Sequence, residues 1–214
     1  MNRRKLFAAA IVLALVMLIG SILAYFTDTD TATNKFTLGD QIEISVVESG
    51  GWVKNAQTGI WENSNAEGIH PGAVVNKAPS IHNDSTTTPA YVFAEVIVPC
   101  YASTGTTADT PLFTLNNIGA DWVKISSNET VNTGNKTITY IYAYATAAAG
   151  PMTQLAANST TTTPVFSTVT LAPTLTAEQK ATAPANPNIV VNGYGIQKDG
   201  LGSADPMTIY GMTH

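Results

Sequence analysis

The chain has 214 residues, of which 12% are charged, and its formal net charge is −5. This length suits one domain of sandwich size or two very small ones. A Thr-rich, weakly charged composition is typical of β proteins, and an acidic chain with scattered lysines offers no basic patch for nucleic acid. The only cysteine, Cys100, excludes an intrachain disulfide, and we expect it to be a small buried residue at a strand end.

Residues 1–24 have the pattern of a signal peptide. A short positive segment, MNRRKLF, precedes the uncharged apolar run at residues 8–24, which is slightly long for a secretory signal and slightly short for a spanning helix. The small residue Ala24, followed at once by polar sequence, favours cleavage between Ala24 and Tyr25; an uncleaved signal anchor is the alternative. Either arrangement exports residues 25–214. We expect a secreted protein that contacts the membrane only through its signal peptide before cleavage.

The stretch after the apolar run, AYFTDTDTATNKF, begins with Ala24 and carries acidic residues at alternate positions. If Asp28 and Asp30 were the first ligands of an EF-hand calcium loop, Ala32 would be the third. Thr33 would then replace the turn glycine and Gly39 the final glutamate. The calcium-loop interpretation therefore fails, and the stretch is either the outer end of an anchor or a new N-terminus.

Apolar patterns predict several strands in the remaining chain. The predicted strands are residues 41–46, 90–98, 122–125, 136–144, 165–169 and 188–196. Pro89 and Pro99 are expected to bound the second of these, which reads as a central strand. In the last, Gly193 and Gly195 predict a bulge or a close backbone approach.

The segments between these strands predict turns, one helix and long loops. Residues 48–72, rich in Gly and Asn, form a long loop or an irregular hairpin in which Trp52 and Trp61 pair or cover the core edge. A turn at 132–135 makes a hairpin with the strand after it. A capping box beginning at Thr176 predicts a short helix that ends before Pro184. Residues 39–214 are thus predicted to form an all-β, antiparallel, jelly-roll-like β-sandwich with one short helix, preceded by the signal helix.

No catalytic or metal-binding motif is readable. The three histidines, His70, His82 and His214, show no zinc-site spacing, and no nucleotide or hydrolase motif occurs. The sequence predicts no catalytic residue, no metal and no cofactor, hence a protein that is not an enzyme. Glu95, within an apolar run, is expected at a wet strand edge or paired with a lysine.

A stripe of three tyrosines alternates along the strand predicted at residues 136–144. Tyr140, Tyr142 and Tyr144 are expected to form a half-exposed sheet face. A stacking platform for sugar or single-stranded DNA is the less favoured interpretation, because basic residues do not accompany the stripe.

The N-terminal region resembles the TasA/camelysin family of exported bacterial proteins, which a dedicated signal peptidase of the endoplasmic-reticulum type processes. The similar positions are Ala24, Tyr25, Phe26, Asp28, Asn34, Phe36, Gly39 and Ile42-Glu43-Ile44. Residues 70–99 and 191–200 are also similar to biofilm-matrix members, whereas residues 100–187 match only in general character.

The resemblance implies a jelly-roll subunit that polymerises into extracellular biofilm-matrix fibres. Residues 25–38 would then be a donor strand added to a neighbouring subunit, which suits a Thr-rich segment free of Pro and Gly. The donor residues implied are Tyr25, Phe26, Asp28, Ala32 and Phe36. The implied partners are other copies, related matrix subunits and the signal peptidase. A camelysin-like metallopeptidase and a surface adhesin or carbohydrate-binding sandwich, using the Trp52–Trp61 loop and the tyrosine face, are the alternatives.

Overall fold

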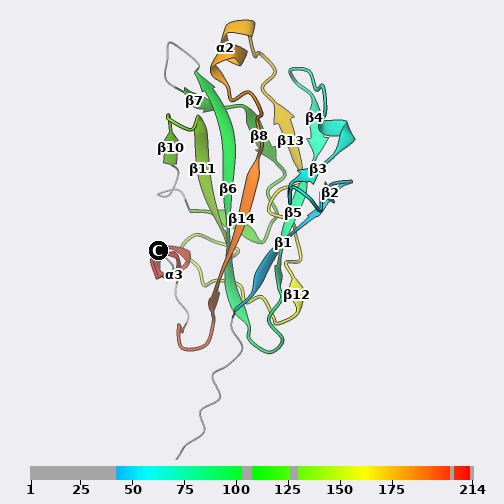
Figure 1. Cartoon of the computed structure of the whole chain (residues 1–214). Coiled ribbons are helices and arrows are strands. Elements are labelled where there is room, and N and C mark those ends of the chain that lie inside the picture. The colour runs from blue at the N-terminus through cyan, green and yellow to red at the C-terminus, as the bar shows by residue number, and fades with distance from the viewer. Residues whose placement is uncertain (1–41, 103–107, 126–129, 203–204, 213–214) are drawn as a thin grey trace, which may run out of the picture. The chain divides into compact units, whose positions relative to one another are not determined.

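A computed structural model describes residues 42–102, 108–125, 130–202 and 205–212, all within one compact unit that extends from Gly39 to His214 (Figure 1). The described chain is mostly antiparallel β-strand with short helices, which confirms the all-β prediction. Its helices are all too short to cross a membrane. The predicted signal peptide and donor strand, residues 1–24 and 25–38, lie outside the described residues.

The first layer is a sheet built around one long central strand, β6 (Ala90–Ala102). Its strands follow the order β10-β11-β6-β14, with β7 beside β6 and β9 beside β11. These flanking strands are β7 (Ala108–Pro111), β9 (Trp122–Lys124), β10 (Thr130–Asn132), β11 (Thr137–Tyr144) and β14 (Val190–Gln197). All pairs are antiparallel, as the sequence predicts for hairpins and sandwich strands.

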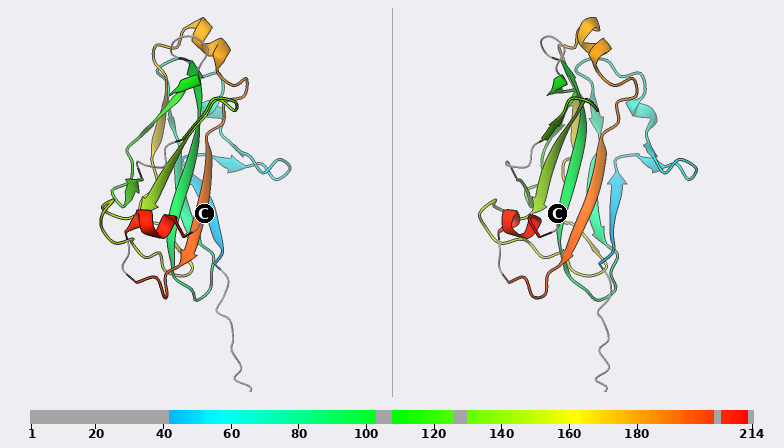
Figure 2. Two further views of the ribbon diagram at one scale, coloured as in Figure 1. Left: turned by 90° about the vertical axis from the view of Figure 1, so that its left-hand side faces the viewer. Right: turned by 60° about the vertical axis from the view of Figure 1, so that its left-hand side comes forward.

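The second layer consists of two short sheets, with orders β1-β5-β12 and β4-β13-β8. The strands are β1 (Ile44–Ser49), β4 (Val74–Asn76), β5 (Ala78–Asn83), β8 (Phe113–Asn116), β12 (Ser159–Thr160) and β13 (Thr168–Leu171). Backbone hydrogen bonds bridge the two sheets: Val165 donates to Pro79 at 2.8 Å and Lys77 donates to Ser167 at 3.1 Å. Together they make one layer that faces the first (Figure 2).

The main core lies between these layers. Alternate residues of β6, namely Val92, Ala94, Val96 and Val98, are fully buried on the inner face, as the period of a strand requires. Ile81 and other residues of the second layer pack in the same cluster, and burial of this apolar surface is the main stabilising term of the fold.

A smaller apolar cluster covers the outer face of the first sheet. Its cover is the helix α3 (Pro206–Tyr210), whose Ile209 is fully buried and whose Tyr210 ring lies 5.4 Å from the ring of Phe93. The helix is not among the sequence predictions. Its start signals were nevertheless present, because Asp205 caps the backbone N–H groups of Met207 and Thr208 and a proline follows the cap.

Several predicted boundaries were shifted. Strand β1 begins at Ile44 and continues to Ser49, and β13 begins at Thr168 rather than at residue 165. The prediction that Pro99 ends the central strand was wrong, because β6 continues through it to Ala102. The Pro99 carbonyl accepts from Leu112 at 2.7 Å, and β7 becomes the partner of the strand beyond this point.

The capping box was predicted correctly: α2 (Ala177–Thr182) begins at the Thr176 cap, and both of its reciprocal hydrogen bonds are present. Cys100 is fully buried within β6, as expected.

Two expectations about sheet faces were wrong. Tyr142 and Tyr144 are buried against the main core, so the tyrosine stripe faces inward instead of forming a half-exposed face. Glu95 lies on the central strand, and it accepts from Asn192 at 2.7 Å and from the Tyr194 hydroxyl at 3.1 Å instead of pairing with a lysine. In both cases the strand order decided the outcome, since β6 and β11 are central strands.

Candidate functional site

The seam between β1 and β14 is the open side of the sandwich. Among the described residues, β1 pairs only with β5 and β14 pairs only with β6, so each strand has one edge without a partner strand. The two strands lie side by side and run in opposite directions (Figures 1 and 2). Unpaired strand edges attract a further strand, because their N–H and C=O groups lack partners.

One end of this seam is closed by side-chain packing. Ile42 and Ile44 lie directly over two glycines of β14. A Cβ at Gly195 would lie 2.5 Å from Cγ1 of Ile44, and a Cβ at Gly193 would lie 3.0 Å from Cγ2 of the same residue. The glycines admit a close approach, but by isoleucine side chains and not by a backbone, and since the β14–β6 register is continuous, there is no bulge.

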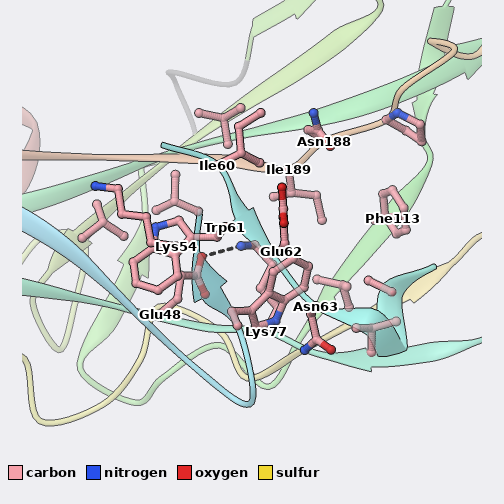
Figure 3. A pocket seen from close by; sticks show the side chains of 18 of the residues that line it. Glu48, Lys54, Ile60, Trp61, Glu62, Asn63, Lys77, Phe113, Asn188 and Ile189 are labelled. Atoms are coloured by element: carbon pink, nitrogen blue, oxygen red, sulfur yellow. Dashed lines mark hydrogen bonds and ion pairs between the residues drawn. The ribbon is translucent and has the colours of Figure 1, made fainter. Parts of the chain in front are cut away.

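The other end of the seam opens into a cavity of about 730 Å³ (Figure 3). It is lined by β1 from Ile44 to Glu48, by the start of β14, by single residues of β4, β8 and β13, and by a small hairpin with the short helix that follows it. That hairpin pairs β2 (Val53–Lys54) with β3 (Trp61–Glu62), and η1 (Ser64–Ala66) comes next. The main apolar lining residues are Trp52, Ile60, Trp61, Ile69, Phe113 and Ile189. We refer to this cavity and the two flanking strand edges as the seam groove.

The hairpin corresponds to the Gly/Asn-rich stretch in which the sequence predicted a loop or an irregular hairpin. Trp52 and Trp61 both line the groove. The Trp52 indole N–H donates to the Asn76 carbonyl at 2.6 Å, and its ring centroid lies 4.6 Å from Nζ of Lys77. The aromatic part of the groove wall is therefore held in place by directional contacts, and charged residues such as Lys54 and Glu62 lie beside it. Ile60 is 50% exposed at its rim, a large apolar side chain left in contact with water.

A buried ion pair lies in the lining of the groove. Along β1 the inward-facing positions are Ile44, Val46 and Glu48, so a carboxylate occupies a position where the alternation calls for an apolar residue. Its Oε1 accepts from the Lys77 ammonium, and the side chains of Glu48 and Lys77 are only 2% and 6% exposed. Glu48 Oε2 is buried too, and it has no hydrogen-bond partner among the described residues.

Burial raises the pKa of the Glu48 carboxyl above its ordinary value of 4.5, and the positive charge and hydrogen bond of Lys77 only partly oppose this effect. The ion pair thus leaves the carboxylate incompletely stabilised. An unsatisfied buried oxygen costs about 1–3 kcal/mol, and more for a charged group, and because this oxygen is buried, a molecule in the groove could reach it only if the surrounding side chains moved.

The described residues show no metal site. They contain no group of three or more His, Cys, Asp and Glu side chains that could hold a metal ion. His70 is exposed, His82 Nδ1 lies 2.8 Å from the Thr160 hydroxyl oxygen, and His214 lies outside the described residues.

Comparison of the chain with protein-family models, with curated proteins and with solved structures found no match. The predicted cleavage and donor residues all lie outside the described residues. They are Ala24, Tyr25, Phe26, Asp28, Ala32 and Phe36.

The groove itself is not among the sequence predictions. One signal could have revealed it, namely Glu48 at the end of an inward-facing apolar row. The alternation of β1 indicates that the Glu48 charge is buried. Its ion-pair partner, Lys77, lies 29 residues away along the chain and could not be identified from the sequence.

Proposed function

We propose that this protein is a secreted structural subunit that polymerises into extracellular biofilm-matrix fibres, and that the seam groove accepts the N-terminal segment, residues 25–38, of a neighbouring copy. The observation that carries the proposal is the groove: a cavity with both apolar and charged lining residues, between two strand edges that lack a partner strand among the described residues. A strand added there would gain main-chain hydrogen bonds from an edge and apolar contacts from the cavity.

The segment that would fill the groove has matching chemistry. Residues 25–38 contain Phe26, Ala32 and Phe36 but no Pro or Gly, so they can form an extended strand with apolar anchors. Tyr25 and Asp28 complete the proposed donor set. The segment is too polar to bury enough surface alone, which makes a groove on another copy a suitable partner.

We further propose that the sandwich is a variant of the jelly roll. With β1, β4/β5, β6, β8, β11, β12/β13 and β14 taken as the first, second, third, fourth, sixth, seventh and eighth strands, and β7, β9 and β10 not counted, the eighth, third and sixth lie together in one layer. The second, seventh and fourth lie together in the other. These are the neighbours expected of two interleaved Greek keys. The variation is at the edge, since β1 pairs with β5 and not with β14.

Signal cleavage is the assembly switch in this proposal. A segment joined to a membrane-inserted signal cannot reach the groove of another subunit in solution, whereas cleavage between Ala24 and Tyr25 frees it. The subunit has no enzymatic role here, so chelators should not alter assembly, and related matrix subunits with similar segments could be copolymer partners.

The decisive experiment is electron microscopy of the purified mature protein, combined with N-terminal sequencing. We expect fibres, and a first residue of Tyr25. A variant that lacks residues 25–35 should remain folded by circular dichroism and monomeric by sedimentation. If that variant still forms fibres, strand donation is wrong. A chelator-sensitive caseinolytic activity in the metal-loaded protein would instead support the metallopeptidase alternative.

A further inference from the structure

The strands of the second layer present an outer face that carries no Asp, Glu, Lys or Arg side chain. Alternate residues of these strands point away from the main core, as the period of a strand requires. All of these outward residues are at least partly exposed, and they are Ser45, Val47, Ser49, Val74, Asn76, Ala78, Ser80, His82, Thr114, Asn116, Thr160, Thr168 and Thr170. We refer to this set as the neutral face.

The neutral face has the composition of an interface. Depletion of charged residues distinguishes protein interfaces from the rest of a protein surface. Two large apolar side chains are left in contact with water on this face, since Val47 is 42% exposed and Val74 is 63% exposed. The outer face of the first layer differs, because α3 covers part of it and Glu95 adds a charge to it.

The chemistry of the neutral face suits a second copy of the same face. Its polar groups are mainly hydroxyls and amides, which both donate and accept hydrogen bonds, so the face is complementary to itself. Most of its side chains are short, which lets two sheets approach to the usual packing distance of about 10 Å. The chain carries a net charge of −5, so two copies repel one another least where neither presents a charge.

We propose that the neutral faces of two copies pack against each other about a twofold axis, and that this contact joins neighbouring fibres side by side. The second statement rests on the proposed function, whereas the first does not require fibres. The contact is separate from the seam groove, because it uses the outward residues of β1 and the groove uses the inward ones.

The size of the neutral face indicates that many copies must act together. Its outward residues cover an area on the order of 400 Å² per copy, from the spacing of residues along and between strands. A stable interface buries about 800 Å² on each partner. A single pair of copies should therefore separate readily, whereas a row of copies along a fibre should hold through multivalency.

Acidic residues beside the neutral face determine which twofold arrangement is favoured. Glu43 and Asp84 are exposed just beyond one end of the face, and Val74 lies at the other end of the long β4–β5 strand. An axis along the strands would oppose the acidic ends of the two copies, whereas an axis across the strands places each acidic end over the partner's Val74 end. Because like charges across an interface are unfavourable, the second arrangement is preferred. Val47, which pairs with Ser80 near the middle of that strand, then lies close to its own counterpart.

The first test does not depend on fibres. The chain lacking residues 25–35, which cannot donate a strand, is attached through its C-terminus to latex beads, and its fold is checked by circular dichroism. Since α3 lies over the first layer, this attachment leaves the neutral face outward (Figure 1). We expect the beads to cluster above a threshold density of attached protein, measured by light scattering.

A lysine near the twofold axis should prevent this clustering. Val47→Lys places two like charges opposite each other and should raise the threshold density about tenfold or more. Val131→Lys is the matched control, because it makes the same change at a side chain of similar exposure, 45%, on β10 of the first layer. Beads that carry the Val131→Lys chain should cluster like wild type.

The second test uses fibres of the mature chain and distinguishes the two axes. Val74→Glu would place a carboxylate against the partner's Asp84 and should separate bundles into single fibres. Val74→Lys would place an ammonium there and should leave the fibres bundled. Electron microscopy and low-speed sedimentation measure the bundled fraction.

Each outcome bears on one claim. If the wild-type beads do not cluster at any density, or if Val47→Lys and Val131→Lys weaken clustering equally, self-association of the neutral face is overturned. If the beads cluster but the mature chain forms no fibres, the proposed function fails and the neutral-face contact stands. If wild-type fibres stay single, the side-by-side contact between fibres is overturned. Equal separation of fibres by Val74→Glu and Val74→Lys would overturn the axis across the strands.

Discussion

The two ends of the seam between β1 and β14 solve the same packing problem in different ways. At one end, glycines at positions 193 and 195 let the two strands approach until Ile44 fills the space between the layers. At the other end, β1 carries Glu48 at the equivalent inward position, and a cavity of about 730 Å³ takes the place of packed side chains. The seam is thus filled by the Ile44 side chain at one end of β1 and remains open beside Glu48 at the other.

This difference shows how a sandwich can hold an apolar groove without collapsing into it. At the open end the buried Glu48–Lys77 pair takes the place of an apolar side chain that could pack against β14, and a buried pair is costly unless every polar atom is satisfied. The contacts of Trp52 with the Asn76 carbonyl and with the Lys77 ammonium fix the position of the indole ring in the groove wall.

Removing one partner of the ion pair should have the largest effect on stability. Glu48→Leu leaves the Lys77 ammonium buried without a counter-charge, and we expect the free energy of unfolding to fall by about 3–5 kcal/mol. Adding Lys77→Met removes both charges and should restore or exceed wild-type stability. Urea denaturation of the three chains measures this. Equal stability of Glu48→Leu and the double variant would show that Lys77 finds another partner.

At the closed end, a larger side chain should force the strands apart. Gly195→Val places atoms where Ile44 now lies, and overpacking of this kind lowers the free energy of unfolding by about 1–3 kcal/mol. Gly134→Ala is the matched control, because its Cβ would have one neighbour, at an ordinary 3.5 Å from Oδ1 of Asn132. If both variants unfolded at the wild-type urea concentration, the closed end would not depend on glycine.

A smaller effect is expected from the groove wall. Trp52→Phe keeps an aromatic ring near Lys77 but loses the indole donor to the Asn76 carbonyl, a loss worth about 1 kcal/mol. The same variant should leave the closed end intact. Hydrogen exchange of the backbone amides can separate the two, since faster exchange should appear around the β2–β3 hairpin and not around Gly195. Uniformly faster exchange would mean that the seam opens as one unit.

The closed end was partly predictable from sequence and the open end was not. Two glycines in an otherwise apolar strand indicate a close approach, although the residue that fills the space, Ile44, could not be named. The open end depends on contacts between segments far apart in the chain, such as Trp52 with Asn76. Local periodicity reports which face of a strand is buried, but it does not report which strand lies opposite.

The same limit explains the errors in the strand faces. The pattern of alternating tyrosines predicts a strand at residues 136–144, close to the observed β11, yet Tyr142 and Tyr144 face the core because β11 lies beside the central strand β6. Pro99 looked like a strand end because proline cannot donate to a ladder. It is accommodated where β6 exchanges one partner for another, which only the assembled sheet determines.

The pH dependence of stability gives the smallest and most specific comparison. Because the pKa of Glu48 is raised in the folded protein, the folded state binds its proton more tightly than the unfolded state does. The stabilisation from this proton is complete below about pH 4.5 and is lost as the pH rises through the folded-state pKa. The unfolding free energy of the wild type, minus that of Glu48→Leu/Lys77→Met, should therefore decrease as the pH rises from about 4.5.

Asp205, whose pKa is lowered mainly by its hydrogen bond from Thr208, is present in both chains and cancels in the difference. If this difference in unfolding free energy stayed constant or increased with pH, Lys77 would stabilise the ionised carboxylate fully.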